Sequence, residues 1–397
     1  MQLKSLNIAR PVHLPIYTKI SVRLTPFSRL SAAELEAWRQ LEPFVLDGNP
    51  FISPDFIGAA VGHLASECKP EVLLIQRGEE LIGVGVFEAV NSSRSLPLPH
   101  LLSWSTTHTF LDGMWLHRDA AAPAATAMWE YMLRGSHPWH GLEFSRSAQD
   151  SATMRILSDT AEAAHISHWN GPSRQRAKLS PSAIGEHNFL QSVSVKRAKS
   201  LRKGWRELEK RGTPIFELIG PGGQATSDEL RTATEHLLRL EGMGWKAEQG
   251  SALNSDARQA AFMREMAASF GARGQLFFSQ IRVDDEVIAS VAHLVSGTQA
   301  FAFKLGWNPD WERGCPGFQL KARIACDAHN ELMHLESIDS CASEGSFIEH
   351  VWGERQRIGA CLFASSIPGR TALNVVQGLR WIKGCLLHRG RKADPSC

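Results

Sequence analysis

Three side chains in the second half of the chain have the chemistry and the surroundings of proton-transfer groups. Glu241 lies at the end of a predicted helix, in LEGMGWK, where two glycines let the chain turn into a cleft. Asp339 closes a predicted strand, and His293 lies within an apolar strand. A carboxylate or an imidazole held at the open end of a sheet can take a proton from an attacking amine or hydroxyl. Each also has a structural alternative: solvation at the helix end for Glu241, a strand cap for Asp339 and a hydrogen-bonded core position for His293.

The segment 300–329 combines a predicted strand, an irregular loop and a helix whose start is marked by Cys315, Pro316 and Gly317. A helix start after a strand offers free backbone amides and a positive dipole end, which can hold a pyrophosphate. Gly317 has no side chain to block a close approach. Arg313 just before the helix, and Lys321 and Arg323 in its first turns, add positive charge. The same pattern also fits an ordinary strand-to-helix connection with a proline at its start.

Tryptophan is unusually frequent, with twelve Trp against two Tyr. Trp245, Trp307 and Trp311 lie in the same segments as the predicted site, and Lys246 follows the first of them. Their flat apolar surfaces can flank an acyl chain, a sugar ring or an adenine, although core packing explains them as well.

The run 196–211 holds eight Lys or Arg against Glu207 and Glu209 on one predicted helix. A solvated helix face is the usual explanation of such a run. Contact with the phosphates of a cofactor, or with a polyanionic acceptor, is the alternative. Only Trp205 interrupts the run, whereas a dedicated RNA-binding element interleaves several aromatic side chains for stacking.

The composition describes a folded globular protein rather than a disordered or fibrous one. The chain has 397 residues, 43% hydrophobic and 21% charged, with a formal charge of +2, so it is long enough for two cores and too neutral to gather polyanions as a whole. Seven Cys without a C-x-x-C pair indicate neither a disulfide framework nor a zinc site. We expect no signal peptide, no membrane span and a cytoplasmic location.

Common catalytic templates are missing from the sequence. It contains no G-x-S-x-G, no H-E-x-x-H, no H-x-E with P-C-x-x-C and no G-x-x-x-x-G-K-[ST]. The segment GVGVFE lacks the third glycine of a dinucleotide-binding fingerprint. Nothing in the sequence calls for a metal.

The first half is predicted to hold two helices, a hairpin, and two further helices around a short strand. In chain order these are a helix over 30–42, a helix from Pro54 capped by Ser53, strands over 71–76 and 81–90, a helix over 121–134, a strand over 141–145 and a helix over 147–164.

Comparable elements recur after the polar stretch 170–185, which itself holds a possible strand at 176–179. They are helices over 189–211, 227–243 and 255–270 with a strand at 214–219, a meander of strands over 274–283, 286–294 and 299–305, a helix over 317–332, strands over 335–340 and 358–364, and a helix over 369–387. The order predicts an α+β fold of two comparable halves, residues 1–180 and 181–397.

Four segments resemble a known family. They are NPFISPDF (49–56), SVKRAKSLRKGWRELEKRG (194–212), LEGMGWKAEQGSAL (240–253) and FAFKLGWNPDWERGCPGFQL (301–320). The second half resembles the GNAT acyltransferase fold, and more narrowly the cellulose-biosynthesis-associated (CelD-like) acetyltransferases, relatives of the FemAB transferases with tandem GNAT halves. The loop departs from the common Q/R-x-x-G-x-G/A pattern, because R-G-C-P-G stands there, and FIEHVW (347–352) replaces a Tyr-Lys-x-x-Trp.

The resemblance implies two GNAT-like halves, each a mostly antiparallel sheet flanked by helices, with acetyl-CoA or another acyl-CoA bound by the second half. It implies cofactor contacts from the strand and the helix start: Phe301, Ala302, Phe303, Lys304, Arg313, Cys315, Gly317, Phe318 and Gln319. The acceptor, an amine or hydroxyl of a sugar or polysaccharide precursor, would meet Trp245, Lys246, Trp307 and Trp311, with the first half completing the cleft. Two other functions stay open: a FemAB-like transferase that uses aminoacyl-tRNA, and a scaffold without catalysis.

Overall fold

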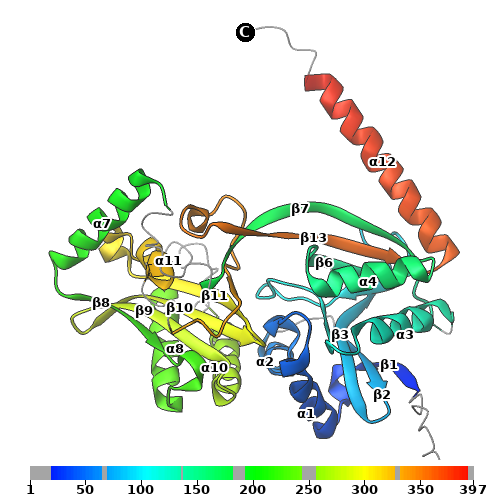
Figure 1. Ribbon diagram of the computed structural model, residues 1–397, viewed down its shortest axis with the longest axis horizontal. Helices are drawn as coiled ribbons and strands as arrows, with labels where there is room; N and C mark the ends of the chain where they lie inside the picture. The colour runs from blue at the N-terminus through cyan, green and yellow to red at the C-terminus, as the bar shows by residue number, and fades with distance from the viewer. Residues whose placement is uncertain are drawn as a thin grey trace, which may run out of the picture.

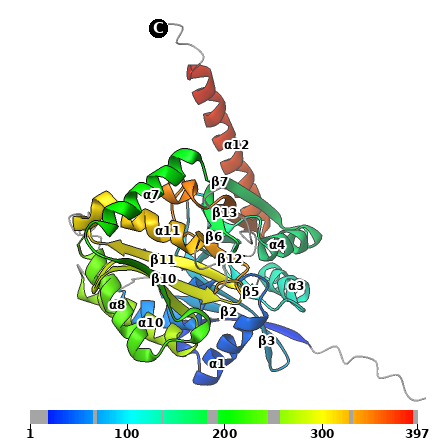
Figure 2. The same ribbon diagram turned by 60° about the vertical axis from the view of Figure 1, so that its left-hand side comes forward.

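The computed structural model describes residues 19–64, 69–135, 137–181, 193–243, 256–326 and 331–391, and the side chains of all of these except 381–391. One thirteen-stranded sheet runs through the described residues. Helices pack against it in two groups, and the last helix projects away from the body (Figures 1 and 2). The structure is therefore α+β, as predicted.

The first half contributes seven strands and four α-helices to the described structure. In chain order they are β1 (Ile20–Pro26), α1 (Ala32–Leu41), α2 (Pro54–His63), β2 (Glu71–Arg77), β3 (Glu80–Val90), β4 (His100–Ser103), β5 (Met114–Leu116), α3 (Ala121–Leu133), β6 (Gly141–Ala148), α4 (Ala152–Ala163) and β7 (Ser167–Leu179).

The second half repeats much of this order. Its elements are α7 (Val195–Glu209), β8 (Pro214–Ile219), α8 (Ser227–Glu241), α10 (Ala257–Ala272), β9 (Leu276–Val283), β10 (Glu286–Ser296), β11 (Gln299–Trp307), α11 (Pro316–Cys326), β12 (Ser337–Asp339), β13 (Glu354–Ala364) and α12 (Ile367–Arg391). In each half, two helices precede three antiparallel strands, and a helix then leads to a strand that pairs in parallel: β6 with β4, and β12 with β11. The chain is thus a structural repeat.

Each repeat lends its last strand to the other. β13, from the end of the chain, lies between β6 and β7 of the first repeat, and β7 pairs with β12 of the second. β7 and β13 form the long ribbon that connects the two groups of helices in Figure 1. The boundary at residue 180 stays a prediction, and the exchange of strands shows that the two repeats share one sheet.

Side-chain caps explain where several helices begin. Ser31 and Thr226 each form a capping box with the glutamate three residues later, which pairs the first free amides of α1 and α8. Ser53 accepts a hydrogen bond from the amide of Phe56 at the start of α2, as predicted.

Several predicted element bounds were wrong. The helix expected over 147–164 begins at Ala152, because Ser147 and Ala148 end β6 and pair with β13, a partner more than 200 residues away. The helix expected over 317–332 ends at Cys326 in the described structure, with a turn at 331–334. The strand expected at 176–179 is the end of the thirteen-residue β7. Strands β1, β4 and β5 were not predicted.

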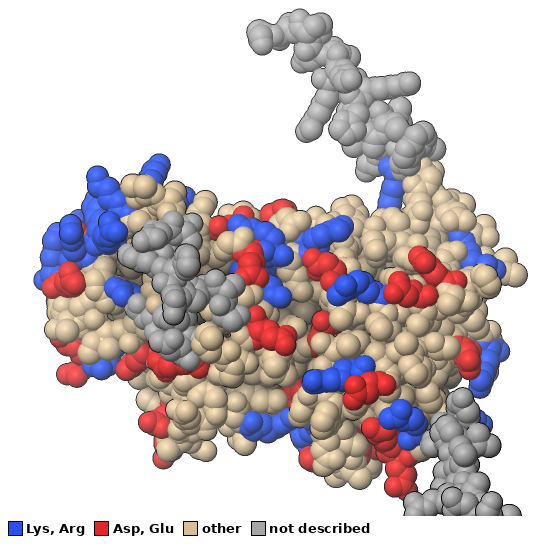
Figure 3. All heavy atoms as spheres, in the orientation of Figure 1, with Lys and Arg blue, Asp and Glu red and all other residues tan. Residues whose placement is uncertain are grey.

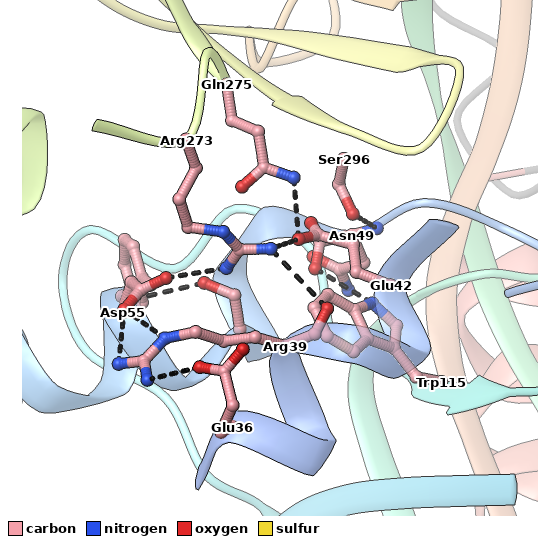
Figure 4. A network of polar contacts seen from close by, with 11 residues as sticks. Glu36, Arg39, Glu42, Asn49, Asp55, Trp115, Arg273, Gln275 and Ser296 are labelled. Atoms are coloured by element: carbon pink, nitrogen blue, oxygen red, sulfur yellow. Dashed lines mark hydrogen bonds and ion pairs between the residues drawn. The ribbon is translucent and has the colours of Figure 1, made fainter. Parts of the chain in front are cut away.

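The segment NPFISPDF joins the two repeats (Figure 4). Asp55 receives hydrogen bonds from Arg39 of α1 at 2.9 Å and from Arg273 of the second repeat at 2.7 Å. Arg273 also binds the buried Glu42 at 2.7 Å, and Gln275 donates to the same carboxylate oxygen. Burial raises the pKa of Glu42, and these two partners act against that rise. This motif therefore has a structural role at the junction of the repeats.

Asn49 and Phe51 complete the junction. The amide of Asn49 donates to the Ser296 hydroxyl of β10, and its side chain accepts from the amide of Phe51. The Phe51 ring packs edge-on against Phe301 of β11, with ring centroids 5.6 Å apart. The core at the junction is thus continuous between the repeats.

We expect Asp55→Ala to lower the free energy of unfolding by about 3 kcal/mol or more, because it leaves two partly buried guanidinium groups without their shared carboxylate. Urea unfolding measures the change. Asp159→Ala is the matched control, since Asp159 is exposed on α4 and should change stability by less than about 0.5 kcal/mol. Equal effects of the two variants would show that the junction does not hold the repeats together.

Candidate acyltransferase site

The parallel strands β11 and β12 separate after three residue pairs. Their pairing ends at Phe301 and Asp339, while β11 continues to Trp307 with β10 on its other side. Among the described residues no strand pairs with the free edge of β11 from Ala302 to Trp307. Backbone N–H and C=O groups on such an edge can pair with the amides of an extended ligand.

The free edge leads to the start of α11. Cys315 adopts a left-handed conformation, with φ of 50°, immediately before Pro316, and the amides of Phe318 and Gln319 both donate to its carbonyl. A Cβ placed on Gly317 would lie 3.4 Å from Leu305 and from Trp307, which shows how closely the helix start approaches β11.

A hollow of about 240 Å³ opens at this helix start. Its lining residues are Trp307, Glu312, Cys315, Pro316, Gly317, Phe318 and Phe347. The hollow brings together four of the predicted site residues, and Glu312 is its only acidic lining residue among those described.

Helix α7 brings its basic side chains close to this helix start. Gln319 donates to the carbonyl of Leu201 on α7 at 2.7 Å, and a Cβ on Gly204 would lie only 2.8 Å from the carbonyl oxygen of Gly314. A hydrogen bond from Lys210, with the charges of Lys203 and Arg313, lowers the pKa of Glu207. Figure 3 shows the Lys and Arg side chains gathered over α7.

Asp339 lies where the two strands separate, and it is buried. Its carboxylate accepts from the amide of Cys341 at 2.6 Å and from Arg176 of β7 at 3.4 Å. Arg176 also donates to the carbonyl of Phe110. The first repeat therefore supplies the cation that holds this carboxylate, because β7 pairs with β12.

Lys321 was expected only to add positive charge at the helix start, and the structure instead places it in the interior. It lies in the first turns of α11, is 1% exposed and interacts electrostatically with Asp339 and Cys341. Burial lowers the pKa of Lys321 to about 7, despite the opposing effect of those two groups. A signal was available, since the residues three and four positions from Lys321 on the helix are apolar: Gly317, Phe318, Ile324 and Ala325.

Lys321→Met should make the stability of the protein less dependent on pH. The lysine has a lower pKa folded than unfolded, so below about pH 7 folding buries a charge, and this cost fades as the pH rises toward the unfolded pKa. We expect the variant to gain about 3 kcal/mol more over the wild type at pH 6 than at pH 9.5, measured by urea unfolding. An equal difference at both pH values would contradict a lysine that loses its proton near pH 7.

His293 and Glu241, the other two candidate bases, lie away from the edge of β11 that β12 pairs with. His293 is fully buried on β10, stacked on Phe277 with centroids 4.3 Å apart, and its Nε2 lies 3.0 Å from the Ser279 hydroxyl. Burial, with the charge of Lys321, lowers the pKa of His293 well below its ordinary value. Glu241 is buried at the end of α8, and its backbone packs against Gly306 of β11.

The other predicted residues divide between the site and the core. Phe301 and Phe303 pack into the junction core, and Ala302 pairs with His293. Lys304 lies 5.6 Å from the Phe110 ring centroid. Arg313 is exposed.

The tryptophans also divide. Trp307 lines the hollow, whereas Trp311 is buried, donates to Glu286 and carries Arg211 over its ring at 3.6 Å. We leave Trp311 out of the proposed site for that reason. Trp245 and Lys246 lie outside the described residues.

Comparison with known protein families agrees with this arrangement. Residues 195–345 match the family described as the acetyltransferase (GNAT) domain. The second repeat carries a GNAT domain. It spans α7 to the loop after β12, which includes the separating strands, the start of α11 and Asp339. The GNAT domain makes the chain an acyltransferase, as predicted.

Solved structures share the fold over most of the chain. One is the C-terminal domain of a protein assigned as a lysylphosphatidylglycerol synthetase from Agrobacterium fabrum, 13% identical, with a TM-score of 0.52 over 87% of this chain and 95% of that chain. FemX has 9% identity and a TM-score of 0.52 over 86% of this chain and 98% of that chain. No curated protein matches the sequence. Within the described residues, no helix has the length and apolar character of a bilayer span.

Proposed function

We propose that the protein transfers an acyl group from acyl-CoA to an amine or hydroxyl acceptor. The observation that carries the proposal is the free edge of β11, which runs from Asp339 to the start of α11. The edge suits the two amides of pantetheine, and the positive end of α11 suits the pyrophosphate. Lys203, Lys210 and Arg313 all act on Glu207 of α7, and in this proposal they meet the remaining phosphate.

In this proposal Asp339 acts as the general base. It lies where the thioester would reach the gap between β11 and β12, and Arg176 and the Cys341 amide fix its carboxylate. The acceptor nitrogen or oxygen attacks the thioester carbonyl carbon and passes its proton to Asp339. That attack forms the new C–N or C–O bond, the C–S bond then breaks, and CoA leaves as the thiolate. Lys321, poised near pH 7, is the nearby group that can return a proton to it.

The acceptor class rests on the resemblance to the CelD-like family, which points to a sugar or polysaccharide precursor. A cytoplasmic location fits the four free cysteines among the described residues, Cys315, Cys326, Cys341 and Cys361.

A second candidate donor is aminoacyl-tRNA, and the exposed basic face of α7 supports it. The name of the Agrobacterium fabrum protein also points to lysyl transfer by that protein. The two donors differ in salt dependence, because tRNA held by the phosphate contacts of α7 would dissociate steeply as salt rises.

Calorimetry with acetyl-CoA tests the proposal. We expect one acetyl-CoA to bind per chain, and CoA thiol to be released when amino sugars are added. Absence of acetyl-CoA binding, with salt-sensitive binding of tRNA, would favour the second donor. Binding without thiol release for any amine or hydroxyl offered would favour a scaffold.

A further inference from the structure

A second hollow, of about 520 Å³, lies between the two repeats beside Asp339. Strands β6, β7 and β13 and the loop after β12 line it, and Cys341 and Arg176, the two residues that bind the Asp339 carboxylate, are part of its wall. Its charged lining residues are Arg146, Arg174, Arg176 and Glu344. Three guanidinium groups thus face one carboxylate in the lining.

The three arginines are not equally engaged. Arg176 is committed to Asp339 and to the Phe110 carbonyl. Arg146 lies 4.0 Å from the buried Asp112, and over a third of its side chain is exposed. Arg174 is exposed, and its side chain has no hydrogen bond or ion pair with any described residue. The Glu344 carboxylate is already bound, because it accepts from the amide of Gln175. Arg146 and Arg174 therefore have donors to offer.

The exchange of strands is what gathers these side chains. Arg174 and Arg176 are two residues apart on β7 and so lie on one face of the strand. β13 lies between β7 and β6, with Ile358 paired to both Arg174 and Ala148, which brings Arg146 of β6 near the same floor. A Cβ on Gly359 would meet Gln149 at 2.5 Å, so the floor there needs a glycine.

We propose that this pocket binds an oxyanion group of the acceptor, a phosphate or a carboxylate, and so directs the acceptor's nucleophile toward Asp339. The inference rests on the acyl transfer proposed above. Planar guanidinium groups bind both oxyanions with paired hydrogen bonds, and two arginines with unused donors suit the larger charge of a phosphate. Arg146 and Arg174 are then specificity-determining residues of the acceptor site.

Matched ligands test the proposal in two arms. Calorimetry compares glucosamine 6-phosphate with glucosamine, and β-alanine with β-alanine amide, with and without acetyl-CoA present. We expect the anionic member of one pair to bind at least about tenfold more tightly than its neutral partner. A preference in the glucosamine pair would indicate a phosphate site, and a preference in the β-alanine pair would indicate a carboxylate site. Equal affinities in both arms would overturn the inference.

Variants locate the binding. Arg174→Gln should remove most of the preference without harm to the fold, because Arg174 has no described partner, and Arg146→Gln should act in the same direction. Arg155→Gln on α4 is the control, since it makes the same charge change at an exposed site outside the pocket. The site would be refuted if the preference for the anionic ligand were unchanged in both pocket variants. It would also be refuted if the Arg155→Gln control lost the preference to the same extent. Acetyl-CoA affinity is measured in parallel: its absence from the wild type counts against the proposed function, while an intact anion preference would still support the pocket.

Discussion

Gly317→Asp is expected to lower the affinity for acetyl-CoA by at least about a hundredfold. Gly317 is the second residue of α11, so the new carboxylate would face the site proposed for the pyrophosphate. Two unit charges 4 Å apart repel by about 4 kcal/mol at an effective dielectric constant of 20, and a fraction of that energy suffices for the loss. Calorimetry with acetyl-CoA measures it.

The stability of the Gly317→Asp variant should not fall along with its affinity for acetyl-CoA. An acidic side chain in the first turn of a helix favours the helix by about 0.3 to 1 kcal/mol, so Gly317→Asp should unfold no more easily than the wild type. Gly317→Ala is the control, because its Cβ fits at 3.4 Å from Leu305 and Trp307 and adds no charge. Affinity lost equally in both variants would mean that the added bulk, and not the charge, blocks the site. Unchanged affinity for acetyl-CoA in both variants would show that the start of α11 does not bind the cofactor.

Local sequence signals predicted the helix starts and the strand meanders well. A few neighbouring residues were enough to predict the start of α2 at Ser53 and Pro54. The same holds for the β9–β10 hairpin, which the alternating runs on either side of Asp284 indicate. Local signals of the same kind predicted the strand, the loop and the helix start of the proposed cofactor site.

The exchange of last strands could not be predicted in this way. The pairing of β13 with β6 joins residues more than 200 positions apart, and its pairing with β7 joins residues nearly 200 apart, so no local pattern in β13 indicates either partner. Arg176 was missed as a partner of Asp339 because the two residues are 163 positions apart and meet only through the pairing of β7 with β12. Lys321 was predicted as a positive charge at the helix start, and its burial was missed because a single lysine on a helix is usually solvated. Among the candidate bases, only the structure separates Asp339, at the gap between strands, from His293, in the core.

The exchange also explains why neither repeat would make this site alone. Asp339 belongs to the second repeat, but its guanidinium partner Arg176 lies on the strand lent by the first. The proposed chemistry therefore depends on the sheet that the two repeats share.

Asp339→Asn should then have the largest effect on turnover, a fall in kcat of about 10² to 10⁴, because it removes the group proposed to take the acceptor's proton. The asparagine oxygen can still accept from the Cys341 amide, so the fold and the affinity for acetyl-CoA should be kept. The rate of CoA thiol release, with acetyl-CoA and the best acceptor of the amino-sugar series, is the measurement.

Glu241→Gln and His293→Gln provide the decisive comparison, since each removes a competing base. The first change is nearly isosteric, and the second also removes the ring stacked on Phe277. We expect both to keep kcat within about tenfold of the wild type, because neither side chain lies at the gap where β11 and β12 separate. Asp159→Asn controls for the loss of one exposed carboxylate elsewhere. A large fall in Glu241→Gln, with Asp339→Asn near the wild-type rate, would move the base to the end of α8 and leave Asp339 as a partner that only positions Arg176.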